Sequence, residues 1–231
     1  MKLYGQIHLD EGGMYKSVRA MHLQQSIIDI TNQNIVGFNK VGYQKDVPYV
    51  SSFAEYIGSH ALSAQRDDEV GRLKLTQNPL DMALGCKGYF QVQTPNGVKL
   101  TRDGRFKLDK DGNLLTVENF KVLATDGEPV KFNKMPRDLE DIKIDKNGHI
   151  KVIDPENLKI HDIGTIAAVD SEHSPLKENN INQGYAEESN VVLHQEAYSL
   201  ITMRRNFQAN RQLFIIQSDS ITKTLQELGK A

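Results

Sequence analysis

A heptad pattern over residues 189–228 restricts the fold of this chain more than any other feature. Steps of four and three residues alternate along it, as they do between the a and d positions of a coiled coil. Eight of the eleven positions, which we call the seam, are apolar. The seam comprises Leu193, Ala197, Leu200, Arg204, Phe207, Arg211, Phe214, Ser218, Ile221, Leu225 and Leu228.

A single long helix is the structure that this stretch predicts. Residues 185–228 contain neither Pro nor Gly, and Ser189 has a side chain suited to an N-cap. At 1.5 Å per residue the helix would be about 60 Å long, which is too long to fold back onto a domain of this size. The seam therefore needs a partner, either the N-terminal helix or another chain. Arg204 and Arg211 interrupt it, which favours selective pairing over a simple two-stranded zipper.

The N-terminal region contains a second helical pattern, over about residues 14–35. Met14, Val18, Met21 and Ile28 recur near one face at the spacing of an α-helix. We expect this helix to end at Gly37. If it pairs with the C-terminal helix, the chain between them is an insertion at the far end of a coiled coil.

The middle of the chain predicts an all-β domain. Asp or Asn followed by Gly recurs in turns at 95–97, 109–112, 125–127 and 145–148. Short runs between the turns, several of which alternate apolar and polar residues, are typical of antiparallel strands. They lie at 89–93, 98–101, 105–108, 121–123, 142–144 and 150–152.

These patterns predict an α+β protein: a discontinuous helical coiled-coil domain from both termini, with an inserted all-β domain. We expect the N-terminal helix within 1–40, an extended connector over 41–70, the β domain over 71–180 and the long helix within 181–231. Asn78, Pro79, Asp81, Gly85 and Gly88 are expected to form a rigid turn that leads into the β domain, because Pro79 fixes its own φ and restricts Asn78.

Composition excludes several classes of partner. Lys and Arg number 28 and Asp and Glu 30, for a net charge of −2, so no electrostatic footprint for nucleic acid is present. The longest apolar runs fall far short of the roughly 20 residues of a membrane helix, so we expect no membrane insertion. The N-terminus shows no cleavable signal.

Motifs for catalysis, cofactors and metals are absent from the sequence. The chain has no GxSxG, HExxH or GxxxxGK[ST] pattern. Its seven His residues lie without metal-ligand spacing, and its single Cys excludes a Cys-based zinc site. Turn 109–113 has its Gly two positions too early for a calcium loop. We therefore expect no catalytic, cofactor-binding or metal site.

Three blocks, in order along the chain, match motifs that occur together in one family of bacterial proteins. Residues 30–38 (ITNQNIVGF) are similar to the family's N-terminal helix end, Asn-x-x-Thr-x-Gly-Phe. Residues 76–92 (TQNPLDMALGCKGYFQV), with 100–106 (LTRDGRF) and 109–115, resemble T-x-N-P-L-D-x-A-I-x-G-x-G-F-F-x-V and Y-T-R-x-G-x-F … D-x-x-G-x-L. Residues 183–191 and 200–210 (LITMRRNFQAN) resemble Q-G-x-L-E-x-S-N-V … L-I-x-x-Q-R-x-Y-x-x-N. With these three blocks the chain resembles the bacterial flagellar basal-body rod and hook proteins.

The resemblance implies a structural protein. Terminal helices of such proteins pair as a coiled coil, and many subunits pack into a torque-transmitting tube with the β domain outside the helical layer. Copies of the chain, other rod and hook proteins and, in transit, the type III export apparatus would be its partners, and it would reside in the periplasmic rod of the basal body. The length of 231 residues favours the proximal over the distal rod. Subunit packing is expected at Met14, Val18, Met21, Ile28, Asn34, Gly37, Phe38, Leu193, Leu200, Arg204, Phe207, Asn210, Phe214, Ile221, Leu225 and Leu228, with Arg204, Arg205 and Asn210 as candidates for polar contacts that set register.

Two other functions are compatible with the sequence. A non-enzymatic binding module could use a homodimeric coiled coil as a stalk, which predicts a stable dimer and no polymer. A cell-wall glycan hydrolase on the β domain would need two converging carboxylates about 5–9.5 Å apart. No Asp or Glu pair stands out for that role.

Overall fold

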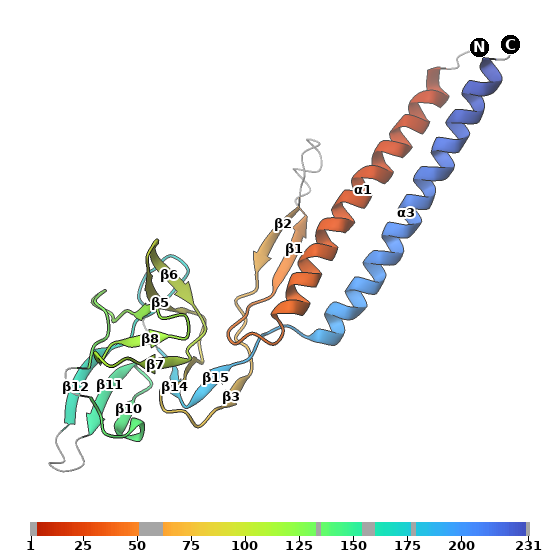
Figure 1. The fold of residues 1–231 in the computed structure, drawn as a ribbon. Helices are drawn as coiled ribbons and strands as arrows, with labels where there is room; N and C mark the ends of the chain where they lie inside the picture. The colour runs from red at the N-terminus through yellow and green to blue at the C-terminus, as the bar shows by residue number, and fades with distance from the viewer. Residues whose placement is uncertain (1–3, 51–61, 133–134, 154–159, 177–178, 230–231) are drawn as a thin grey trace. The chain divides into compact units, whose positions relative to one another are not determined.

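The computed structural model describes residues 4–50, 62–132, 135–153, 160–176 and 179–229 (Figure 1). Along the chain, two long helices, α1 (Tyr4–Gly37) and α3 (Leu193–Leu228), stand before and after a central run of antiparallel strands, which confirms the α+β class. The strands are β1 (Asp46–Val50), β2 (Leu62–Arg66), β3 (Leu73–Leu75), β4 (Met82–Leu84), β5 (Tyr89–Thr94), β6 (Gly97–Thr101), β7 (Phe106–Leu108), β8 (Leu114–Thr116), β9 (Lys121–Val122), β10 (Ile142–Ile144), β11 (His149–Ile153), β12 (Ile160–Thr165), β13 (Ala168–Val169), β14 (Ile181–Gln183) and β15 (Tyr185–Glu187), with one 3₁₀ turn, η1 (Leu139–Asp141).

The chain divides into two compact units. Unit 1 takes in Met1–Val36, Asp46–Asp67 and Val192–Ala231, and unit 2 takes in Gly37–Lys45 and Asp68–Val191. Four chain crossings therefore join them, because both helical ends and a middle segment belong to unit 1. The domains expected from the sequence stay a prediction, and their bounds differ from this division at 37–45, 46–67 and 181–191.

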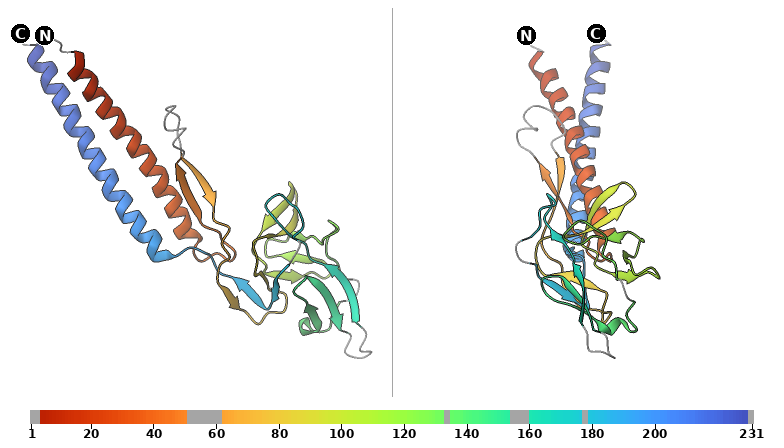
Figure 2. Two further views of the ribbon diagram at one scale, coloured as in Figure 1. Left: turned by 180° about the vertical axis from the view of Figure 1, so that it is seen from behind. Right: turned by 90° about the vertical axis from the view of Figure 1, so that its left-hand side faces the viewer.

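Unit 1 is built on α1 and α3, which lie side by side and antiparallel in both views of the ribbon (Figure 2). Asn210 Nδ2 on α3 donates to Gln24 Oε1 on α1 over 3.2 Å, and Asn34 Nδ2 donates to Glu196 Oε2 over 3.3 Å. Since the higher number on α1 pairs with the lower number on α3, these bonds fix the antiparallel direction. Heptad packing of the coiled-coil kind stays a prediction.

Both helices begin at residues other than those expected. The backbone of α1 is already helical at Tyr4, ten residues before Met14, and continues through Gly12 and Gly13. At the other end of the chain, α3 begins at Leu193 after the N-cap residue Val192, which makes no side-chain cap. Ser189 is therefore not the N-cap, because the chain before α3 is extended and its hydroxyl instead accepts from the Val191 amide over 3.2 Å.

A hairpin occupies much of the stretch expected to be an extended connector. Strands β1 and β2 pair antiparallel from Asp46↔Arg66 to Val50↔Leu62. The sequence reveals no such pairing, because Pro48 interrupts the first strand and neither strand alternates apolar and polar residues.

Unit 2 contains a six-stranded antiparallel sheet and a three-stranded sheet, β10-β11-β12. In the larger sheet the strands follow the order β13-β5-β9-β8-β7, and β6 also pairs with β5. Every strand run expected between 89 and 152 corresponds to a strand of one of these sheets. Gly97, Gly112, Gly127 and Gly148 in the expected turns all have positive φ, between 79° and 118°. The core includes Phe90 and Phe106, whose rings meet edge to face with centroids 5.3 Å apart.

Strands from the two ends of unit 2 close it. The late strands β14 and β15 pair with the early strands β4 and β3, in registers that join Ile181 to Leu84 and Tyr185 to Leu75. Met82, Ala83 and Leu84 are fully buried as a result. Among the described residues, no helix is both long and apolar enough to cross a membrane.

Candidate assembly site

One face of α3 is covered by α1 only in part. Ala197, Leu200, Phe207, Phe214 and Ile221 are half-buried, and no described residue of α3 is fully buried. On α1, Ile28 is 7% exposed, while Met14, Val18 and Met21 are half-buried. The contacts between α1 and α3 described above are polar, and the apolar side chains of both helices stay partly open; direct packing of the two apolar faces is still a prediction.

Other seam positions lie outside this contact. Arg204 and Arg211 are exposed, as are Leu193, Leu225 (64%) and Leu228 (55%). Asn210 is half-buried and makes the polar contact to Gln24 within the chain. The exposed leucines at the two ends of α3 are consequently open for contact with another chain.

A second apolar stripe runs along the opposite face of α3. Its spacings of three and four residues average 3.6, the period of the helix, whereas the half-buried face lies about 180° away. We call this set, interrupted by Arg205, the outward stripe: Tyr198, Ile201, Ala209, Leu213 and Ile216. Tyr198 is 69% exposed, Ile216 55%, and Ile201 and Leu213 50% each. The sequence analysis misses the outward stripe, because steps of four and three residues from Leu193 follow only one face of the helix.

The N-terminal motif residue Asn34 fastens the hairpin to α1. Its amide donates to the Asp46 carbonyl and accepts from the Asp46 amide, each over 2.9 Å, and the side chain is 2% exposed. The side chain thereby supplies both partners that the backbone of β1 lacks on this edge. Asn34 is therefore placed to support unit 1 from inside, away from any surface that another subunit could contact.

Gly37 and Phe38, the end of the same motif, lie in unit 2. A Cβ on Gly37 would overlap the ring of Tyr43, so close packing of that ring accounts for the glycine. Phe38 is 38% exposed. Of the two, only Phe38 has surface available to a neighbour.

The expected turn at residues 78–81 has the geometry of an Asx turn. Asn78 Oδ1 accepts from the Leu80 amide over 3.2 Å, and its Nδ2 donates to Asp81 Oδ1 over 2.9 Å. Further on, a Cβ on Gly85 would lie 2.5 Å from Asn180 Nδ2, and one on Gly88 would lie 2.5 Å from Leu176 Cδ1. Pro79 is half-buried, and its carbonyl accepts from Gln183 Nε2 over 2.9 Å. These residues hold backbone segments together and present no converging polar groups.

A buried polar network of unit 2 centres on Arg102, which the sequence analysis does not single out. Arg102 Nε donates to Glu187 Oε2 over 2.7 Å, and both side chains are at most 2% exposed. Its Nη atoms donate to three carbonyls, those of Leu84, Cys86 and Gly88. Glu187 Oε1 accepts from the Gly71 amide over 2.8 Å. Every charge here is thus paired and hydrogen-bonded, as a buried ion pair requires.

A neighbouring arginine shows the contrasting, exposed arrangement. Arg105 pairs with Asp103, Nη2 to Oδ2 at 2.6 Å, with side chains 43% and 30% exposed. The hydrogen bond that Arg105 donates to Asp103 raises the pKa of Arg105 above its ordinary value, against the opposing effect of burial. Within the described part of the chain, no three His, Cys, Asp or Glu side chains gather closely enough to hold a metal ion.

Comparisons with known proteins point to one family. The family model for the flagellar hook protein FlgE/F/G D1 domain matches residues 83–152. The chain is 30% identical over 226 residues to the flagellar basal-body rod protein FlgF of Mesorhizobium japonicum, covering 87% of this chain and 89% of that protein. It is 28% identical to the rod protein FlgG of Bacillus subtilis, over 94% of this chain and 98% of that protein, and 26% identical to FlgF of Rhizobium meliloti over the same shares.

Proposed function

The chain belongs to the family of flagellar basal-body rod proteins, and we propose that it builds the rod by self-assembly through α1 and α3. Family membership gives it a structural role and a place in the flagellar basal body. The finer proposal is a helical tube of identical subunits whose packed helices transmit torque.

The outward stripe carries this proposal. Its four large side chains are each at least half exposed on a helix whose other face already contacts α1. Burying apolar surface is worth about 25 cal/mol per Å², and a stripe of this kind marks a contact surface. A helix with two apolar faces can bind one partner in its own chain and another in the next copy. Repeated head to tail, such a contact generates a filament.

Partners follow from the same proposal. Copies of this chain would cover the outward stripe along the tube, and other rod and hook proteins would adjoin the first and last copies. Before assembly the chain would pass through the type III export apparatus. The net charge of −2 argues against nucleic acid as a partner.

A pair of charge substitutions on the outward stripe tests the proposal. Ile201→Glu with Ile216→Glu should abolish polymers seen by electron microscopy and sedimentation, because each carboxylate would have to be desolvated in the contact. Far-UV circular dichroism of the monomer should stay unchanged, since neither residue faces α1. Thr222→Glu with Gln226→Glu is the matched control, because both exposed positions lie beyond the C-terminal end of the stripe and about 80–120° away from its centre line.

Two outcomes would count against self-assembly through this stripe. Normal polymers from the Ile201→Glu, Ile216→Glu variant would exclude the stripe as the contact. A wild-type chain that stops at a closed dimer at all concentrations would instead favour the binding module on a dimeric stalk.

A further inference from the structure

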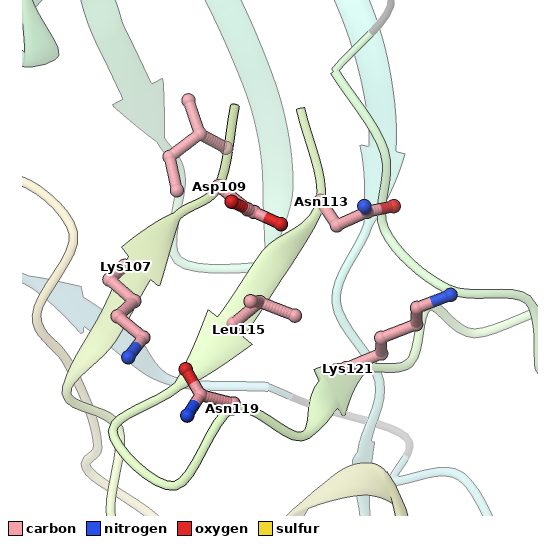
Figure 3. Close-up of a pocket in the computed structure, with 7 residues that line it drawn as sticks. Lys107, Asp109, Asn113, Leu115, Asn119 and Lys121 are labelled. Carbon is pink, nitrogen blue, oxygen red and sulfur yellow. The ribbon is translucent and has the colours of Figure 1, made fainter. Parts of the chain in front are cut away.

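An open hollow of about 580 Å³ lies on the outer face of the six-stranded sheet (Figure 3). Strands β7, β8 and β9 and the turn after β7 supply its walls. The hollow is lined by Lys107, Leu108, Asp109, Asn113, Leu115, Asn119 and Lys121. Figure 3 shows Leu115 on the middle strand, with Lys107 on one side and Lys121 on the other.

Register explains why two lysines flank an apolar side chain. Lys107 pairs with Leu115 across β7 and β8, and Leu115 pairs with Lys121 across β8 and β9. Directly paired residues point to the same face, so the three form one row with the ammonium groups on either side of the leucine. Leu115 is 8% exposed and forms an apolar floor, while both lysines are exposed. Two lysines against the one lining carboxylate, Asp109, leave the wall net positive, so the hollow suits an apolar side chain accompanied by carboxylates.

The same unit presents a segment of that chemistry elsewhere on its surface. In and just before η1, Leu139 is 42% exposed and lies between the exposed acidic residues Asp138 and Glu140. The Asp138 amide donates to Asp141 Oδ2 over 3.4 Å, which closes the turn and leaves Leu139 and Glu140 outside it. None of the described residues that line the hollow comes from this turn.

We infer that the hollow of one copy receives the Asp138–Asp141 turn of a second copy. Leu139 would contact Leu115, and Asp138 and Glu140 would face Lys107 and Lys121. Because hollow and turn are different patches, the contact is head to tail and leaves a free hollow and a free turn at the two ends of any row. The inference deepens the proposed function, since it adds a contact between β units to the helical one.

Cysteine cross-linking between copies tests the contact directly. In a Cys86→Ser background, chains carrying Lys121→Cys are mixed with chains carrying Glu140→Cys and treated with a short bismaleimide. A covalent dimer should form in the mixture and not in either chain alone. Lys107→Glu on the first chain should slow the reaction roughly two- to fivefold, the effect of an exposed ion pair. The matched control is Lys99→Cys, an exposed β6 position on the opposite face of the sheet.

Sedimentation of the same samples separates the two proposals. Cross-linking of Lys121→Cys no faster than that of Lys99→Cys overturns the inference, whether or not the chains polymerise. Polymers without that cross-link leave the proposed function standing and remove only this contact. The cross-link without polymers supports the contact and removes self-assembly through the helices.

Discussion

At the scale of single residues, Arg102 gives a physical reason for the motif at residues 100–106, which this chain shares with the rod and hook proteins. It neutralises Glu187 and satisfies three carbonyls around the strands β4 and β5. No residue but arginine offers five donors in a fixed plane for this purpose. The motif is therefore explained inside unit 2, where a role in catalysis or in contact with another chain is not needed.

Removing Arg102 should destabilise unit 2 strongly. Arg102→Met leaves the Glu187 carboxylate buried without a counter-charge, which costs about 3–5 kcal/mol of unfolding free energy. Urea unfolding followed by circular dichroism measures it. Arg105→Met is the matched control, and the loss of its exposed pair should cost no more than about 1 kcal/mol. Equal losses in the two variants would contradict the burial argument.

Asn34 should matter for the hairpin and much less for the helix in which it lies. Asn34→Ala leaves the amide and carbonyl of Asp46 without these partners, at a cost of about 1–3 kcal/mol. Hydrogen exchange at the Asp46 amide should accelerate accordingly, while amides in the middle of α1 keep their rates. Gln33→Ala, at an exposed neighbour, should change neither.

At the scale of elements, α1 contains a pair of glycines that behave differently. Gly12 faces open space, whereas a Cβ on Gly13 would lie 2.7 Å from Gln217 Nε2 on α3. The sequence suggests a helix start here, because Gly is costly inside helices. The helix nevertheless continues through both, and the missing Cβ of Gly13 leaves room for the Gln217 side chain of α3.

Alanine substitution distinguishes the two positions. Gly12→Ala should stabilise unit 1 by about 0.5–1 kcal/mol, since it removes backbone freedom at no steric cost. Gly13→Ala should gain less or lose stability, because the Gln217 side chain must move. Thermal unfolding at 222 nm gives both values. Restored stability in Gly13→Ala with Gln217→Ala would identify the clash as the cause, and equal gains from both single variants would exclude it.

How far each element can be predicted depends on where its stabilising partners lie. The end of α3 at Leu228 follows from the length of the heptad pattern, and the strands from β5 to β11 follow largely from local turns. By contrast, β14 and β15 are three residues each and pair with strands about a hundred residues earlier, so no local pattern reveals them. Among the site residues, the seam can be predicted from the sequence pattern alone. The outward stripe and the Arg102–Glu187 pair cannot, because they depend on contacts between residues far apart in the chain.

At the scale of the whole molecule, the two units differ in how well a single chain can stabilise them. Among the described residues, Ile28 is the one buried apolar side chain of unit 1, whereas the core of unit 2 includes Phe90, Leu114 and Ile142 at essentially no exposure. Isolated helices depend on such packing for their stability. A free subunit therefore holds its helices weakly and its β unit firmly.

The units should accordingly unfold separately in the free subunit. Hydrogen exchange with mass spectrometry at rising urea should show α1 and α3 peptides exposed at lower concentrations than peptides from β5 and β11. Assembly should raise the midpoint of the helices much more than that of unit 2. Binding stabilises the parts that it contacts, and the helices gain the long apolar contact while unit 2 gains only the small contact between hollow and turn. One common midpoint in the free chain would show that the helices are already fully stabilised within a single copy.

The pairing of the last strands of unit 2 with its first strands also determines the order in which the chain can fold. Glu187 meets a partner 85 residues earlier in Arg102 and another 116 residues earlier at Gly71. Contacts of such separation form late, since a long loop must close first. Until about residue 187 is free to join, β3, β4 and the arginine lack their partners, and the nascent β unit stays open. A chain that emerges gradually from a narrow channel, N-terminus first, would thus stay incompletely folded over most of its length and then close its β unit in one late step.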